Sequence, residues 1–241
     1  MNPTNKSCGV MQPYLFPYIG YFQLIEKCAT FVFYDDVAFI KKGWINKNKI
    51  RNGITASNFV APLQSPSQNK KINETYLAGD EKWILKLQKS LEMNYSKSKN
   101  YKEIKELVLD IASSQSGKNR TIADLAIASI ESTLHYLNLN INCKRSSELE
   151  RTFKEEERSN RLVKITKSQG YNSYINSIGG KDLYSKTEFK KKGIDLLFLK
   201  PEIKEYSQGK KEFLPGLSII DLLMNCTKEE VLMHMSAGKI I

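Results

Sequence analysis

The chain of 241 residues carries 37 Lys and Arg against 26 Asp and Glu, which gives a net charge of +11, and 41% of its residues are hydrophobic. It contains no apolar stretch long enough to cross a bilayer and no basic-then-apolar signal pattern, so we expect a cytoplasmic protein. The four Cys are dispersed and only two His are present. This composition argues against structural zinc sites and disulfide frameworks, and we expect reduced thiols and no metal.

The first fifth of the chain has the pattern of an α/β unit. The predicted elements are, in order, an apolar strand over 8–11, an extended loop over 12–17, a helix over 18–27 and a strand over 30–34. The loop follows from Pro13 and Pro17, because each Pro removes a backbone donor and restricts the residue before it. The helical spacing of the apolar residues places Gln23 on the solvent side.

The rest of the chain continues the alternation of strands and helices. We expect strands at 54–63, 141–146, 171–178 and 194–199, and helices at 80–95, 101–114, 120–139, 181–192, 217–225 and from Lys228. A further amphipathic helix follows the charged stretch 148–161. The sequence therefore predicts an α/β fold with a mixed or parallel central sheet, flanking helices and a helical insert around 80–139, all within one domain spanning 1–241.

Asp35 and Asp36 directly follow the strand predicted over 30–34. Ligands of open α/β sheets bind beyond the carboxyl ends of the strands, so this pair and the loop 12–17 should share one edge. A carboxylate there can bind a sugar hydroxyl, take a proton from an attacking amine or hold a metal ion. Adjacent carboxylates on a strand point apart, which disfavours the metal. A turn made by the aspartate side chains themselves is the structural alternative.

Basic and aromatic residues alternate after the aspartates. Lys42 and Trp44, with Asn46 and Asn48 beyond them, suit a ligand that joins phosphate to a flat base or sugar ring, as a nucleotide sugar does. The net positive charge also favours polyanionic partners, although abundant Lys is equally typical of a low-GC genome. A solvated Lys-rich surface with Trp44 packed below it is the alternative. No RNA-binding signature accompanies the segment, so we expect no stable nucleic-acid partner.

Gly179 and Gly180 lie between an extended segment and a predicted helix. Glycines at such a turn let backbone N–H groups approach an anion. The segment is not a P-loop, because the spacing differs and no Ser or Thr follows Lys181. A plain strand-to-helix turn is the structural alternative.

Four segments together resemble the WbqC-like protein family, whose members commonly accompany genes for bacterial surface-polysaccharide synthesis. They are MQPYLFPYIGYF from Met11, FVFYDDVAFIKKGWINKNKI from Phe31, SYINSIGGKDLY from Ser173 and FLPGLSIIDLLMN from Phe213. The resemblance covers essentially the whole chain. The chain departs from the family pattern at Met11, where many relatives carry His. The opening unit also resembles the start of the nucleotidyltransferase and Rossmann-like folds, including pantothenate synthetase, without that group's paired histidines.

The resemblance implies an enzyme of O-antigen or capsule synthesis that transfers an acyl or aminoacyl group, glycyl among them, to a nucleotide-linked amino sugar. It implies no cofactor beyond the acyl donor, which a carrier protein can supply. The alternative is a non-catalytic protein that binds a carrier protein or a glycan-synthesis enzyme, and the assembly state, a homodimer among the options, stays open. The residues assigned to catalysis are Tyr21, Asp35 and Asp36. Those assigned to substrate binding are Gln12, Tyr14, Lys42, Trp44, Asn46, Asn48, Gly179, Gly180 and Asp221.

Overall fold

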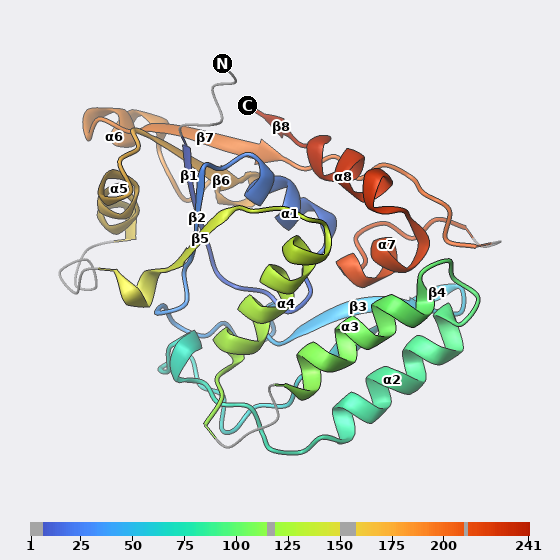
Figure 1. The fold of residues 1–241 in the computed structure, drawn as a ribbon. Coiled ribbons are helices and arrows are strands. Elements are labelled where there is room, and N and C mark those ends of the chain that lie inside the picture. Colours follow the sequence, from blue (N-terminus) through green and yellow to red (C-terminus); the bar gives the residue numbers. More distant parts are fainter. Residues whose placement is uncertain (1–6, 115–118, 150–157, 210–211) are drawn as a thin grey trace.

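A six-stranded sheet forms the centre of the protein (Figure 1). The computed structural model describes residues 7–114, 119–149, 158–209 and 212–241. The strand order is β5-β2-β1-β6-β7-β8, and every neighbouring pair is parallel except β7 and β8. The strands are β1 (Ser7–Met11), β2 (Thr30–Phe33), β5 (Asn142–Arg145), β6 (Ser173–Ser177), β7 (Asp195–Lys200) and β8 (Lys239–Ile240). The predicted α/β class with a largely parallel sheet is confirmed.

Helices cover both faces of this sheet, as the unbroken burial of β2 requires. Figure 1 shows the helices of the two faces on opposite sides of the strands. One face carries α1 (Ile19–Glu26) and α8 (Lys228–Ser236), and the other carries α5 (Arg158–Ser168) and α6 (Lys186–Lys191). Two apolar clusters result, one between the strands and α5 and α6, and a larger one that extends from α1 into the helical insert.

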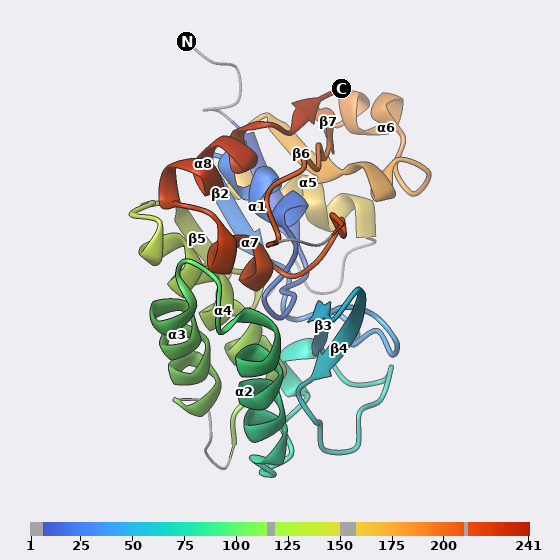
Figure 2. The same ribbon diagram turned by 90° about the vertical axis from the view of Figure 1, so that its right-hand side faces the viewer.

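The helical insert lies beside the sheet together with a separate hairpin (Figure 2). Its helices are α2 (Lys82–Tyr95), α3 (Tyr101–Ser113) and α4 (Ile122–Tyr136), and α7 (Ile219–Asn225) packs against α3. The hairpin pairs β3 (Lys47–Asn52) with β4 (Thr55–Val60) in antiparallel fashion, and Gly53 adopts the left-handed conformation that its turn requires. None of the helices in the described part of the chain has both the length and the apolar composition needed to span a membrane.

Three local expectations differ from the structure. Gln23 is fully buried, because α1 is covered by the sheet on one side and by α8 on the other. Its amide donates to the carbonyls of Glu202 and His234, at 2.7 and 2.8 Å, and so avoids an unpaired polar group. The helix expected over 181–192 begins only at Lys186, where Ser185 caps it. Strands β3 and β8 were not expected, and residues 150–157 of the charged stretch lie outside the described ranges.

Candidate functional site

A cleft of about 210 Å³ opens at the carboxyl ends of β1 and β6. The chain runs outward from β1 to β2 and β5 on one side and from β6 to β7 on the other, so the strand order reverses between β1 and β6. Such a reversal is where open α/β sheets bind their ligands. Polar and aromatic side chains from four segments line the cleft, and two glycines complete its wall: Gln12, Tyr34, Arg158, Tyr174, Asn176, Ser177, Gly179, Gly180 and Tyr184.

Asn176 is held at the end of β6 with its amide directed at the Gly179–Gly180 turn. Its Oδ1 accepts a hydrogen bond from the backbone N–H of Ser177 at 2.8 Å. A Cβ added at Gly180 would lie 2.4 Å from Asn176 Nδ2, whereas one added at Gly179 would meet only Ser177 Oγ at 3.9 Å. A side chain at position 180 would therefore have to displace this amide. No hydrogen-bond acceptor among the described residues contacts Asn176 Nδ2, so that donor can serve a ligand.

The loop 12–17 contributes Gln12 to the lining of the cleft, whereas Tyr14 is not among the lining residues, and the loop is fixed from several sides. Tyr21 donates its hydroxyl proton to the carbonyl of Gln12 at 3.0 Å, and its ring packs against Tyr14 at 5.7 Å between centroids. Burial raises the pKa of Tyr21 well above its usual value, so the phenol stays protonated. Asn48 donates from Nδ2 to the carbonyls of Leu15 and Phe16 at 3.1 and 2.8 Å. In this geometry Tyr21 and Asn48 position the loop, and their roles toward a substrate remain predictions.

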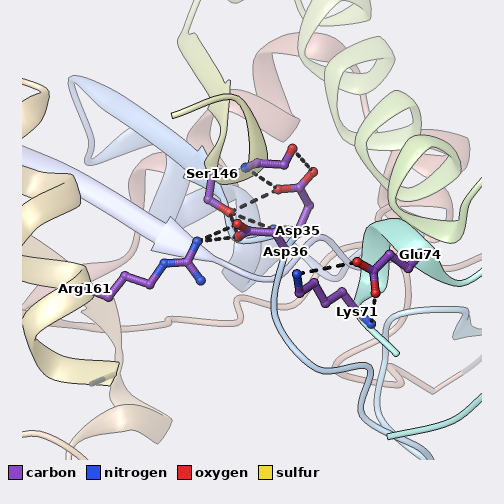
Figure 3. A network of polar contacts seen from close by, with 7 residues as sticks. Asp35, Asp36, Lys71, Glu74, Ser146 and Arg161 are labelled. Carbon is purple, nitrogen blue, oxygen red and sulfur yellow. Dashed lines mark hydrogen bonds and ion pairs between the residues drawn. The ribbon is translucent and has the colours of Figure 1, made fainter. Parts of the chain in front are cut away.

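Asp35 and Asp36 lie at the carboxyl edge of the sheet, in a buried network that Figure 3 shows. Both Asp36 oxygens lie within 2.7 Å of Arg161 Nη2. Asp35 accepts from the backbone N–H and the hydroxyl of Ser147 at 2.9 and 2.7 Å. The Ser146 hydroxyl is within hydrogen-bonding distance of both aspartates, and its one proton serves one carboxylate at a time. The two carboxylates thus tie the end of β2 to the end of β5 and to α5.

Arg161 connects this network to the cleft. Its guanidinium carbon lies 4.8 Å from the ring centroid of Tyr34, a favourable arrangement of a cation over an aromatic face. Tyr34 lines the cleft, as does Leu162, the next residue in α5. The side chain of Arg161 is 6% exposed and that of Asp36 is 2% exposed. The acidic pair therefore supports the cleft wall from behind, and a proton-accepting role for Asp36 requires Arg161 or Ser146 to release an oxygen.

The basic and aromatic segment starts at the cleft rim and leads away from it. Ile40 lines the cleft, and the exposed Lys42 follows in a left-handed conformation. Trp44 is 42% exposed, and the Nζ atoms of Lys47 and Lys49 lie 5.8 and 5.2 Å from its ring centroid. The ammonium groups of Lys47 and Lys49 thus already lie over the Trp44 ring.

Two further predicted binding residues make internal contacts. The side-chain amide of Asn46 donates to the carbonyl of Ala61 at 2.9 Å and fastens the hairpin. Asp221, on α7, lies in a separate buried network, where it accepts from Tyr95 Oη at 2.6 Å, Tyr206 Oη at 2.7 Å and Gln208 Nε2 at 2.8 Å. Neither residue is among those that line the cleft.

The structure also brings residues to the cleft that the sequence interpretation passed over. Asn176 carried a usable signal, since it is a polar residue near the end of a predicted extended segment, three residues before Gly179. No sequence signal indicated the role of Arg161, because its partner Asp36 is 125 residues away in the chain. Within the described ranges, no group of three or more His, Cys, Asp or Glu side chains is arranged to hold a metal ion.

Comparison with known proteins places the chain among its relatives. The model of the WbqC-like protein family matches residues 12–233. The chain belongs to this family. It is also 24% identical over 226 residues to Rv1507c, an uncharacterised protein of Mycobacterium tuberculosis, and the match covers 93% of this chain and 95% of that protein. No solved structure matches the chain. The WbqC-like match contains the loop 12–17, both aspartates, the glycine turn and α7.

Proposed function

We propose that this protein binds a nucleotide-linked amino sugar in the cleft between β1 and β6 and transfers an acyl or aminoacyl group to the sugar amine during surface-glycan synthesis. The observation that carries the proposal is the donor of Asn176, directed at Gly180 where the strand order reverses. A sugar hydroxyl or a phosphate oxygen is the acceptor that such an amide binds. Membership of the WbqC-like family supports the glycan setting, which the family resemblance implies.

In the proposed reaction the amine lone pair attacks the carbonyl carbon of an activated acyl group, for which a thioester on a carrier is the expected donor. A C–N bond forms, the C–S bond breaks, and the thiol leaves with a proton. The amine proton passes to a base, for which we propose Asp36, and the base returns it to the departing thiolate. Because both Asp36 oxygens lie against Arg161 and Ser146, this role requires the buried network to open during turnover.

A non-catalytic binding protein is the second candidate, and the composition of the cleft favours it. The lining side chains are amides, hydroxyls, apolar groups and one guanidinium, that of Arg158. Such a set orients a ligand better than it moves protons, because the described lining holds no imidazole or carboxylate, the side chains that most often act as general bases.

A paired binding and turnover assay separates the two candidates. Nucleotide-linked amino sugars are incubated with acyl and glycyl thioesters, and the mass of the sugar product is measured by mass spectrometry. Calorimetry separately measures binding of the nucleotide sugar alone. We expect binding together with a product heavier by the acyl group, and loss of both in Asn176→Ala. Binding without product would support the binding protein, and the absence of both would overturn the proposal.

A further inference from the structure

A second and larger groove, of about 820 Å³, lies between the turn that joins α2 to α3 and the segment 207–209. Its volume is in the range of small-molecule sites. It is distinct from the cleft, because no residue lines both. A hollow of about 900 Å³ lies elsewhere, at the amino ends of β6 and β7, but there Lys190 is already paired with Asp195 at 2.6 Å.

The charges that line this groove have one sign. Arg51, Lys97 and Lys99 are cationic, and no Asp or Glu is among the lining residues that the structure describes. The other lining groups include the hydroxyls of Ser96 and Ser207 and the side-chain amide of Asn225. Cations combined with hydroxyl and amide donors form the usual environment of a bound phosphate.

Arg51 places a positive charge in the floor of the groove with only neutral direct partners. It is 2% exposed, and its guanidinium donates to the carbonyls of Gly53 and Glu212, at 3.3 and 2.6 Å, and to the side-chain oxygen of Gln208. Its buried Nε contacts no acceptor among the described residues. The guanidinium is connected to the carboxylate of Asp221 through the side chain of Gln208. Because its direct partners are neutral, Arg51 keeps part of its field in this poorly hydrated site, although the Asp221 carboxylate behind Gln208 offsets some of it.

The turn that carries the two lysines is fastened to α7. Ser98 Oγ donates to the side-chain oxygen of Asn225 at 3.0 Å. The amide of Asn100 donates to the carbonyls of Leu223 and Cys226 at 2.8 and 2.6 Å. Lys97 and Lys99 therefore project from a fixed backbone and converge with Arg51 on the same groove. A fixed frame lowers the entropic cost of binding.

We propose that this groove binds the phosphate or diphosphate group of a soluble small molecule, with Lys97 and Lys99 as the accessible cations and Arg51 as a buried one. The exposed Met93 at its edge offers apolar contact to the remainder of the molecule. This inference is independent of the proposed function, because it rests on residues that do not line the cleft.

Isothermal titration calorimetry with inorganic pyrophosphate at low ionic strength tests the inference on the full chain. We expect saturable binding by the parent, weakened at least about tenfold in Lys97→Ala/Lys99→Ala and screened by added salt. The matched control is Lys86→Ala/Lys89→Ala, which removes the same charge from exposed positions of α2 and should change the affinity less than about twofold. The cleft variant Gly180→Ala should not reproduce the loss of pyrophosphate affinity seen in Lys97→Ala/Lys99→Ala, which separates this groove from the cleft.

Three outcomes would overturn the inference. The first is no saturable heat with pyrophosphate, and the second is an equal loss in the two double variants, which would reduce the effect to net charge. The third concerns the source of the phosphate. If the protein sediments with vesicles of phosphatidylglycerol and phosphatidylcholine but does not bind pyrophosphate, the cations are assigned to a lipid surface instead.

Discussion

Two buried aspartates, Asp36 and Asp221, differ in the groups that stabilise their carboxylates. Asp36 is paired directly with a cation, since both of its oxygens lie against Arg161. Asp221 is surrounded by neutral donors, two phenols and one amide, and the nearest guanidinium reaches it only through Gln208. Removing water from a charge costs several kcal/mol, and only a direct partner of opposite charge repays most of that cost.

The consequence is that the two networks should respond differently to mutation and to pH. Direct pairing makes each member of the Asp36 network dependent on the other, because loss of either leaves a buried charge alone. In the Asp221 network the cost of burial remains visible in the pKa of Asp221, which burial raises although Tyr95, Tyr206 and Gln208 donate to its carboxylate.

The largest effect is expected for Arg161→Met. The substitution leaves the carboxylate of Asp36 buried without its cation, which should lower the free energy of unfolding by about 3–5 kcal/mol. Urea denaturation followed by circular dichroism measures it. The control is Lys190→Met, which breaks an exposed pair with Asp195 and should cost less than about 1 kcal/mol. An equal loss of unfolding free energy in the two variants would show that burial does not make the Asp36–Arg161 pair more important for stability than an exposed pair.

Asp36→Asn distinguishes support of the cleft from proton transfer. If Asp36 mainly pairs with Arg161, the neutral amide leaves Arg161 buried and uncompensated, and stability should fall by about 3 kcal/mol. If Asp36 is the base, turnover should be lost with little change in stability. Measuring the unfolding midpoint and the yield of acylated sugar on the same preparation decides between the two roles.

A smaller effect is expected for Asp221→Asn, about 2 kcal/mol, because one acceptor oxygen is replaced by an amino group that faces other donors. The difference in the free energy of unfolding between the parent and Asp221→Asn should depend on pH. Since the pKa of Asp221 is higher in the folded than in the unfolded protein, its charge costs stability above the folded pKa. That cost is relieved as the pH falls through the raised pKa toward the unfolded value near 3.8.

Unfolding curves of the parent and of Asp221→Asn at several pH values between 7 and 4 test this sign. The advantage of the parent over the variant should grow as the pH falls, because Asn does not titrate. An advantage that shrinks over this range would mean that the carboxylate is better stabilised in the folded state than in water.

The parts of the fold that local chemistry determines could be predicted from the sequence. The run TFVF of β2 could only be a strand buried on both faces, and the apolar spacing in α2, α3 and α4 predicted the insert. Strand β3 could not be predicted, because KNKIRN is polar and has only Ile50 as a buried apolar residue; pairing with β4 makes it a strand.

Predicting the candidate site from the sequence was harder, because partners distant in the chain decide what each side chain does. From the sequence alone Asp36 is an available carboxylate, but in the fold α5 places Arg161 against it. Asn48 is a predicted ligand residue, but in the fold its amide donates to two carbonyls of the loop 12–17. The edge of the sheet itself was predictable, since Met11 and Phe33 end adjacent parallel strands. Their place in the sheet follows from strand order, which the sequence leaves open.

The central claim, that the cleft between β1 and β6 binds the nucleotide sugar, is tested most directly by calorimetric titration of Gly180→Ala. The added methyl group would lie 2.4 Å from Asn176 Nδ2 and must displace that amide. Gly79→Ala is the matched control, because a Cβ there meets no atom within 4 Å. We expect Gly180→Ala to weaken binding at least about tenfold while Gly79→Ala binds like the parent. Unchanged affinity in folded Gly180→Ala would contradict the claim.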